Sequence, residues 1–366
     1  MSILIFIIVL GILILVHELG HFIVAKKTGM LVEEFAIGFP PRLFSFQKGE
    51  TKYSIGLIPL GGFVKIFGED YAMANALDDD KRVRCFTNKP KWAQALVLVA
   101  GVFFNLLLAW GLISVGFMSG LPVSVSQFTG ETIDNPELIL VDILPDSPAE
   151  KAGLQAGDII LSLGVGKSES IQDFKNSASA TNFIASRGGR EIEVLYKRGP
   201  ETSLVHLTPE QGIIENKFAI GVSLDVVGTV KFPIHRAFWE GLKATIFWTS
   251  ATAAGLFGFL LSAVTGQADL SQISGPIGII SLVGNAFQFG FVYLLSFVAI
   301  ISINLAVINL IPIPALDGGR LLFVLIEAVK GSPIKPRLAN ALNLAGFAFL
   351  ILLMIIITAS DVFKLF

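Results

Sequence analysis

Residues 3–25 of the chain read ILIFIIVLGILILVHELGHFIVA, and they are apolar apart from His17, Glu18 and His21. A helix needs about 20 such residues to cross the hydrocarbon core of a bilayer. A cleaved signal peptide is disfavoured, because the stretch has neither a basic region before it nor a small-residue cleavage site. We therefore predict a transmembrane helix over about 3–25 that carries three ionisable side chains within five residues.

The composition of the whole chain supports a membrane protein. Of its 366 residues, 53% are hydrophobic and 15% are charged, against about 25% charged residues in soluble proteins. The formal net charge of -2 gives no indication of a nucleic-acid partner. Since Cys85 is the single cysteine, an intramolecular disulfide framework and a cysteine-rich zinc site are both excluded.

Three further apolar runs, at about 93–119, 291–311 and 341–359, are long enough to span a bilayer. The sequence therefore predicts an α-helical integral membrane protein with four transmembrane helices. Residues 246–264 are also apolar, but they are rich in Thr, Ala and Gly. This segment could either span the bilayer or lie at its interface.

The polar stretch at 26–92 separates the first two apolar runs and is rich in basic residues. They are Lys26, Lys27, Arg42, Lys48, Lys52, Lys65, Lys81, Arg82, Arg84, Lys89 and Lys91. The positive-inside rule places this loop in the cytoplasm, so the first helix runs inward and the second returns. Within the loop, residues 33–67 are rich in Gly and Pro yet apolar, which predicts short strands. Such strands can enter the bilayer only where protein covers their backbone.

The remaining segments complete a predicted domain organisation. Residues 1–120 form the first part of a membrane core, and residues 286–366 form its second part. Residues 128–210 predict a separate soluble domain, because alternating runs typical of strands are punctuated there by glycines. We expect residues 230–285 to form an interfacial amphipathic segment.

His17-Glu18-Leu19-Gly20-His21 is an H-E-x-x-H motif within a predicted helix. Residues i and i+4 share one helix face, so both imidazoles can bind one metal ion. Glu18 lies one position further round the helix, where its carboxylate can reach a water on the metal. Zinc acidifies such a water and the carboxylate takes its proton, which is the arrangement for metal-assisted hydrolysis. A buried polar cluster with purely structural partners is the alternative.

A third ligand is needed, because catalytic zinc sites use three protein ligands and a water. Asp317 follows two closely spaced prolines and precedes Gly318 and Gly319. Prolines break a helix and glycines allow a tight turn, so we expect Asp317 on an irregular segment at membrane depth. A carboxylate there predicts a functional group, although a capping aspartate at a helix-end turn is also possible.

Two asparagines precede Asp317 on the third apolar run. Asn309 and Asn304 could each hydrogen-bond the backbone of a substrate or its developing oxyanion. Either amide could equally bond a neighbouring helix. His206 and His235 lie in or after the soluble segment, which places them away from the predicted metal.

Together, H-E-x-x-H in the first span and N-x-x-P-x-P-x-L-D-G-G after the third resemble the site-2 protease family, peptidase family M50. The likeness is closest to bacterial RIP zinc metalloproteases of the RseP type. It extends to Gly61-Gly62-Phe63-Val64, to Asn105 and to Ser274-Gly275-Pro276-Ile277-Gly278. The chain departs from the family pattern at Val102, where the family usually has a proline.

The resemblance implies a fold, a metal and a set of roles. It implies zinc bound by His17, His21 and Asp317, with Glu18 as general base and Asn309 in contact with substrate. It also implies a membrane-associated β-hairpin in the first loop. Residues 147–160 carry S-P-A-x-x-A-G-L-x-x-G-D-x-I, which is typical of a PDZ domain, so the soluble insert is expected to be an α+β PDZ domain.

We therefore predict an intramembrane zinc metalloprotease that hydrolyses peptide bonds in transmembrane or signal-like segments. Its expected partners are membrane-anchored regulators or signal-peptide remnants and the lipid bilayer, with no nucleic acid. Its expected location is the bacterial cytoplasmic (inner) membrane, with the PDZ domain outside the cytoplasm. A divalent-metal transporter and an inactive scaffold that presents the PDZ domain are the alternative functions.

The metal site also predicts a topology. Asp317 must reach the depth of His17 and His21, so the third helix must run inward like the first. An even number of crossings must then lie between the second and third helices. Residues 246–264 provide only one candidate crossing, so we expect this segment to stay on the outer side and Phe366 to lie outside.

Overall fold

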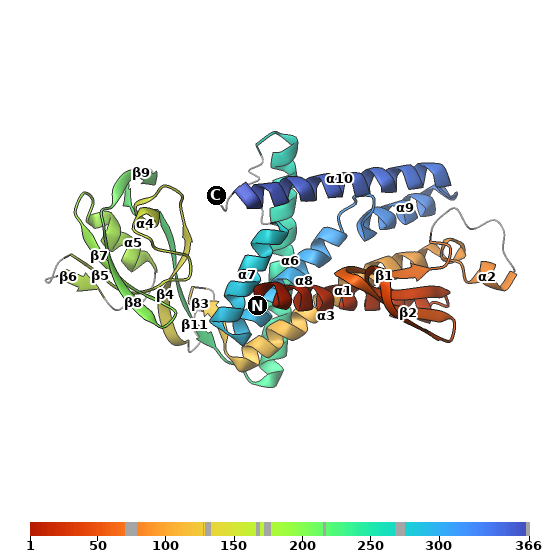
Figure 1. Cartoon of the computed structure of the whole chain (residues 1–366), viewed down its shortest axis with the longest axis horizontal. Helices are drawn as coiled ribbons and strands as arrows, with labels where there is room; N and C mark the ends of the chain where they lie inside the picture. Colours follow the sequence, from red (N-terminus) through yellow and green to blue (C-terminus); the bar gives the residue numbers. More distant parts are fainter. Residues whose placement is uncertain are drawn as a thin grey trace. The chain divides into compact units, whose positions relative to one another are not determined.

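The structure is a computed structural model that describes the chain except for residues 70–78, 127, 129–132, 166–168, 172–176, 215–216, 268–274 and 364–366. The described residues divide into two units (Figure 1). The first comprises Met1–Gly116 and Pro233–Phe366, and the second comprises Phe117–Phe232.

Helices dominate the first unit. They are α1 (Ser2–Lys27), α2 (Asp79–Val83), α3 (Lys91–Ser119), α6 (Ile234–Val264), α7 (Pro276–Phe289), α8 (Phe291–Asn309), α9 (Asp317–Lys330) and α10 (Pro336–Phe363), with a 3-10 turn at Phe86–Asn88. Apolar runs without proline or strong turn residues favour long helices here, because each residue adds an internal hydrogen bond that water need not supply. Lys91 on α3 donates to the buried Glu327 on α9, which joins the two parts of this unit.

Among the described residues, five helices are long and apolar enough to cross a membrane: α1, α3, α6, α8 and α10. The structure therefore supports an integral membrane protein, but it does not confirm the predicted count of four spanning helices. The additional helix is α6, which contains residues 246–264 and begins twelve residues earlier, at Ile234. Its early part carries the charged residues Arg236, Glu240 and Lys243. The helix is therefore longer than the apolar segment that was recognised in the sequence.

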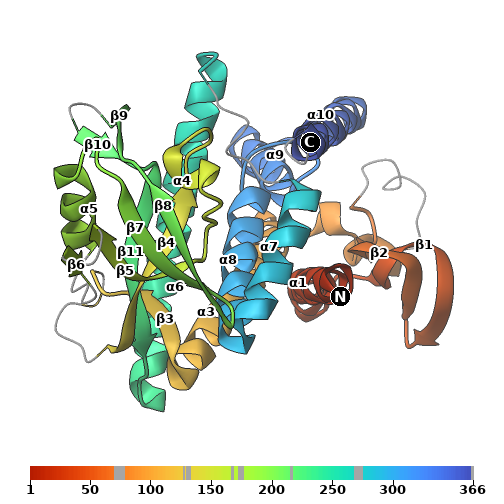
Figure 2. The same ribbon diagram turned by 60° about the vertical axis from the view of Figure 1, so that its left-hand side comes forward.

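The direction of α6 differs from that of α1 and α10. In Figures 1 and 2, α6 runs across the direction of α1 and α10 instead of alongside them. The side chains of Trp239 and Trp248 on α6 are 58% and 39% exposed. Tryptophan is enriched where a membrane meets water, and by length and composition α6 is a candidate span.

A two-stranded antiparallel sheet follows α1. β1 (Val32–Lys48) pairs with β2 (Thr51–Ile66) along most of its length, with several irregularities in register. Its base packs on α1 and α3 through buried side chains that include Phe35 and Val64. These strands begin one residue before the predicted strand region at 33–67, and each is longer than the short strands expected there.

The second unit is built on a seven-stranded antiparallel sheet of order β3-β11-β4-β5-β7-β8, with β6 on β5. Its strands are β3 (Leu121–Ser124), β4 (Asp134–Ile143), β5 (Ile159–Val165), β6 (Glu169–Ile171), β7 (Ile192–Arg198), β8 (Glu201–Leu207) and β11 (Val222–Val230). β9 (Glu210–Ile214) and β10 (Lys217–Ala219) form a separate pair, and the helices are α4 (Pro148–Lys151) and α5 (Ser177–Ser186).

The core of this unit forms where alternate strand residues meet α5. Leu138, Leu163, Ile192 and Val194 are among its most buried members, alongside Ala180 of α5. The unit extends beyond the predicted 128–210 on both sides, because β11 returns between β3 and β4. A sequence that shows alternating runs cannot reveal such a distant pairing.

Candidate metal centre

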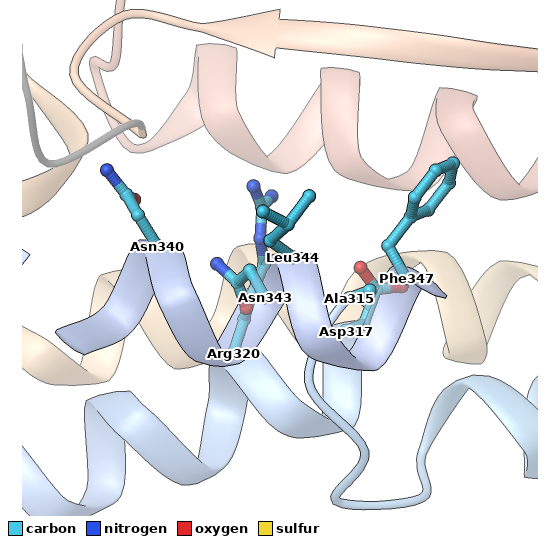
Figure 3. Close-up of a pocket in the computed structure, with 7 residues that line it drawn as sticks. All are labelled: Ala315, Asp317, Arg320, Asn340, Asn343, Leu344 and Phe347. Carbon is cyan, nitrogen blue, oxygen red and sulfur yellow. The ribbon is translucent and has the colours of Figure 1, made fainter. Parts of the chain in front are cut away.

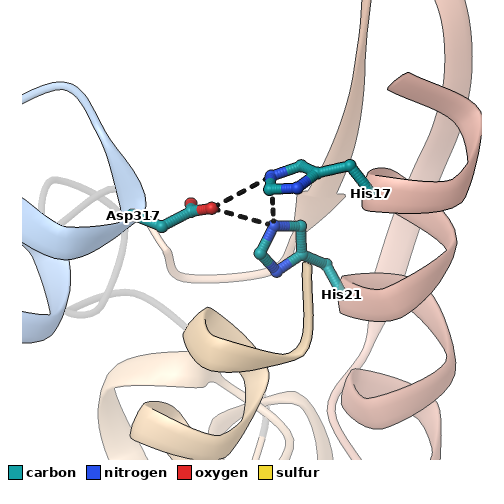
Figure 4. Close-up of side chains that lie close together, drawn as sticks. All are labelled: His17, His21 and Asp317. Carbon is teal, nitrogen blue, oxygen red and sulfur yellow. Dashed lines mark hydrogen bonds and ion pairs between the residues drawn. The ribbon is translucent and has the colours of Figure 1, made fainter. Parts of the chain in front are cut away.

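Helix α1 places two imidazoles on one face. His17 and His21 are each 8% exposed, and their Nε2 atoms lie 3.2 Å apart. The spacing of four residues produces this arrangement, since it returns nearly to the same side of the helix. Figure 4 shows both rings directed toward Asp317, which approaches from the opposite side.

Asp317 reaches the histidines because the chain breaks after α8. Proline residues 312 and 314 lie in the connection from Asn309 to α9, and Asp317 is the first residue of α9. A Cβ on Gly318 would lie 2.3 Å from the carbonyl oxygen of Ile311, and one on Gly319 would lie 2.2 Å from that of Ile313. The two glycines therefore let the connection fold directly onto the start of α9. The positive end of the helix dipole also favours a carboxylate there.

The three side chains form a compact triangle of donor atoms. The Oδ2 atom of Asp317 lies 3.0 Å from His17 Nε2 and 3.2 Å from His21 Nε2. A tetrahedral site with ligands about 2.0 Å from zinc has edges of about 3.3 Å between ligand atoms. The distances therefore match three corners of a zinc site, and two imidazoles with one carboxylate are ligands that zinc accepts.

Groups behind the ligands hold the imidazoles in place. The Nδ1–H of His21 donates to the carbonyl oxygen of Val97 at 2.8 Å, which leaves Nε2 as the atom that can bind a metal. The Nδ2 atom of Asn105 lies 3.1 Å from His17 Nδ1. Neither contact was predicted from the sequence. The contact of Asn105 could have been suspected, because a polar side chain is unusual in an apolar span. The contact of Val97 could not, because it uses a backbone carbonyl oxygen, which every residue has.

Glycines bring α3 close to the ligands. A Cβ on Gly101 would lie 2.4 Å from His21 Nε2 and 2.7 Å from His17 Cε1. On the facing helix, a Cβ on Gly20 would lie 2.5 Å from the carbonyl oxygen of Ala100. The close contact between α1 and α3 at the candidate metal centre therefore requires glycine at both positions, because any side chain would clash with the facing helix.

A small cavity of about 150 Å³ adjoins the triangle and contains the predicted base. Glu18 lines it, together with both histidines and Asp317. β2 passes close by, and a Cβ on Gly62 would lie 3.3 Å from Glu18 Cγ. The structure thus places Glu18 beside the three candidate ligands, where its carboxylate can exchange a proton with a molecule in the cavity.

Glu69 and Arg320 form an ion pair on the wall of the same cavity. Glu69 follows β2 and is 16% exposed in its side chain, whereas Arg320 lies in the first turn of α9. Burial raises the pKa of the Glu69 carboxyl above its ordinary value, while the charge of Arg320 acts in the opposite direction. This pair was not predicted from the sequence.

A larger cavity of about 560 Å³ also adjoins Asp317 (Figure 3). It is lined by Asp317, Arg320 and a face of α10 that includes Asn340, Asn343 and Phe347. Asp317 and Arg320 line both cavities. The candidate metal centre therefore adjoins a space large enough for part of a peptide, since ligand pockets measure about 300–1,000 Å³.

The two predicted substrate-binding asparagines occupy different surroundings. Asn309 Nδ2 lies 3.5 Å from His17 Nε2, at the edge of the triangle. Asn304 Oδ1 instead accepts a hydrogen bond of 3.2 Å from Thr252 Oγ1, which links α8 to α6. Asn304 therefore bonds a neighbouring helix, which was the alternative to its predicted contact with substrate.

Comparison with known proteins identifies relatives along the whole chain. The sequence profile described as peptidase family M50 matches residues 5–353. The chain is 31% identical to the zinc metalloprotease RasP of Oceanobacillus iheyensis, over 99% of this chain and 98% of that protein. It is 32% identical to the regulator of sigma-W protease RasP of Bacillus subtilis, over 99% and 98% of the two chains.

Two further likenesses were found. The chain is 35% identical to a putative zinc metalloprotease of Clostridium acetobutylicum, over 99% of this chain and 97% of that protein. A solved PDZ domain of the SdrC-like protein from Listeria monocytogenes resembles 26% of this chain and is covered over 93% of its own length, at 20% identity and a TM-score of 0.21. The relatives give no support to a metal transporter or an inactive scaffold, and they confirm zinc as the predicted cofactor. The chain belongs to peptidase family M50 and is an intramembrane zinc metalloprotease of the site-2 type.

Proposed function

We propose that His17, His21 and Asp317 hold the catalytic zinc and that Glu18 is the general base. The observation that carries this proposal is the triangle of two Nε2 atoms and one carboxylate oxygen, with Glu18 in the adjoining cavity. Zinc bound there supplies Lewis acidity, which lowers the pKa of water and polarises a peptide carbonyl.

Glu18 carries the proton through the reaction. It takes a proton from the attacking water as the carbonyl carbon is attacked, and it passes that proton to the amide nitrogen as the C–N bond breaks. The products are a new carboxylic acid and a new amine, and transfer of the acid's proton to the amine gives a carboxylate and an ammonium group. Asn309 faces the same centre, so its amide would hydrogen-bond the carbonyl oxygen or the backbone of the substrate, and Asn304 would contribute from an earlier turn of α8.

The substrates in this proposal are transmembrane or signal-like segments of membrane-anchored proteins. The donor triangle joins the apolar helix α1 to the start of α9, and the apolar helix α10 exposes Leu344 and Phe347 at the cavity beside Asp317. A helical segment must unwind locally before its backbone can reach the zinc. The cavity of about 560 Å³ beside Asp317 offers room and polar groups for such an unwound backbone.

The β-hairpin would contact the membrane. Its distal part exposes Leu43, Phe44 and Phe46, which are 65%, 59% and 50% exposed. A soluble loop rarely presents three large apolar side chains so close together. Toward the metal centre, Arg42 and Ser54 both bond the buried Glu34, so the polar groups of the hairpin base are satisfied.

The second unit would be a PDZ domain that lies outside the cytoplasm and screens substrates. Its S-P-A-x-x-A-G-L-x-x-G-D segment forms a capped turn in which Ser147 Oγ accepts from Glu150 N–H. Gly153 and Gly157 adopt positive φ, and Asp158 then binds Arg198 of β7 through two hydrogen bonds of 2.7 Å. This pairing fixes the turn against the sheet, next to the strands that would receive an extended peptide.

Two variants of the purified protein separate the proposed roles. Glu18→Gln should keep stoichiometric zinc and lose hydrolysis of a transmembrane peptide in detergent, because its amide cannot take a proton. Asp317→Asn should lower zinc occupancy at limiting metal, because it removes the anionic ligand. Asp361→Asn is the control, since this buried carboxylate accepts from Gly275 and Gly278 N–H groups. Normal turnover by Glu18→Gln, or unchanged zinc in Asp317→Asn, would refute the corresponding role.

A further inference from the structure

Asn105 is a buried residue of α3, and of its two side-chain polar atoms only Nδ2 has a hydrogen-bond partner among the described residues. Its side chain is 0% exposed, and its Nδ2 atom lies 3.1 Å from His17 Nδ1. Its Oδ1 atom is buried and has no hydrogen-bond partner among the described residues. A buried acceptor without a partner costs about 1–3 kcal/mol, so this amide calls for an explanation.

The backbone around Asn105 is held firmly. The hydroxyl of Ser302 on α8 donates to the Asn105 carbonyl oxygen at 2.8 Å, and Ser302 is itself fully buried. The amide therefore lies at a fixed distance from His17. Rotation about its last side-chain bond remains possible, and a half turn exchanges the amide nitrogen and oxygen.

The two histidines require the same protonation pattern to bind zinc through Nε2. Each ligating imidazole then carries its proton on Nδ1 and needs an acceptor for it. For His21 that acceptor is the Val97 carbonyl oxygen. For His17 the group facing Nδ1 is the Asn105 amide, and an N–H of His17 would there meet an N–H of Asn105.

We propose that Asn105 is the positioning residue of His17: its amide turns so that Oδ1 accepts the Nδ1–H of the zinc-bound imidazole. The same turn provides a partner for the otherwise unpaired Oδ1. Asn105 would then select Nε2 as the ligating atom and fix the plane of the ring, as Val97 does for His21. This inference rests on the zinc site proposed above.

Zinc affinity, measured by competition with a chelator, tests the inference without reference to activity. Loss of such a supporting group lowers metal affinity about 10- to 100-fold. We expect Asn105→Leu, which has no acceptor, to show this loss. Asn105→Asp keeps an acceptor at the same distance and should stay within a few fold of the wild type. A packing role predicts the reverse order, because Leu fits an apolar site better than a charged Asp.

A control and a second variant complete the design. Gln94→Leu removes another buried amide of α3, which donates to the carbonyl oxygens of Thr87 and Lys89 and has no bond to His17. It should keep the wild-type zinc affinity. Asn105→Ala provides a smaller replacement should Asn105→Leu fail to fold, and the same 10- to 100-fold loss is expected of it.

A spectroscopic measurement reports on the tautomer directly. The chain has four histidines, so ¹⁵N-labelled histidine gives a simple spectrum of the zinc-loaded protein. We expect a slowly exchanging Nδ1–H resonance of His17 in the wild type and in Asn105→Asp, and its loss in Asn105→Leu. Wild-type zinc affinity in Asn105→Leu, or equal loss in the Asp and Leu variants, would overturn the inference. Absence of proteolysis by the zinc-loaded wild type would instead count against the proposed function alone.

Discussion

Arg320 on α9 forms an ion pair with Glu69, which comes 251 residues earlier and directly follows the β-hairpin. Both residues line the small cavity that contains Glu18. Since Arg320 lies three residues after Asp317, the pair ties the end of the hairpin to the helix that supplies the third ligand. The hairpin and the metal centre are therefore parts of one packed structure.

Removal of the charge on Glu69 should weaken that structure. In Glu69→Gln, the cation of Arg320 loses the counter-charge of Glu69 beside the proposed zinc site, so we expect weaker zinc binding and a stability loss of about 1–2 kcal/mol. Thermal unfolding and zinc competition would measure both effects. Glu50→Gln is the matched control, because Glu50 pairs with Arg84 but its side chain is 52% exposed. Equal behaviour of the two variants would contradict the assigned role.

The close contact of α3 with the ligands leads to a test of geometry. Gly101→Ala places a methyl group where His21 Nε2 and His17 Cε1 now lie, so zinc occupancy and proteolysis should both fall at least tenfold. Gly111→Ala is on the same helix, and its methyl group would meet nothing within 4 Å. It should bind zinc and cleave normally. The ratio of zinc to protein in the two purified variants gives the answer.

The ends of the second unit suggest a clean excision. Phe232 N–H donates to the Phe117 carbonyl oxygen at 2.9 Å, so a short Gly-Ser linker can join these positions. The excised enzyme should still cleave a short, trimmed substrate, and it should cleave long substrates faster than the intact enzyme does. Both substrates would be compared in proteoliposomes. If the excised enzyme retains zinc but loses all cleavage, the unit is needed for docking and does not screen.

Single cysteines can test the topology predicted from the metal site. In a Cys85→Ala background, Gln267→Cys should react with an impermeant thiol reagent from outside, and Glu50→Cys only from the cytoplasm. A cysteine at Phe366, which lies outside the described residues, should also react from outside. Labelling of position 267 from the cytoplasm alone would mean that α6 crosses the membrane.

Much of the candidate metal centre could be predicted from the sequence, because the residues that mark it lie close together in two short segments. The spacing of His17 and His21 fixes a shared helix face, and the prolines and glycines around Asp317 predict the break that delivers its carboxylate. The contacts of Asn105 and Glu69 could not be predicted from local pattern, since they depend on which faces of distant segments meet. The length of α6 was missed for a related reason: its first turns are polar, so apolarity alone did not mark where it begins.

The separation of 300 residues between His17 and Asp317 has a consequence for biosynthesis. At about 5–20 residues per second, a ribosome makes Asp317 some 15–60 s after His17. Throughout that interval the emerging chain holds at most two of the three proposed zinc ligands. Proteolytic competence is therefore withheld until nearly the whole polypeptide has entered the membrane, so a truncated translation product that lacks α9 would be harmless to its neighbours.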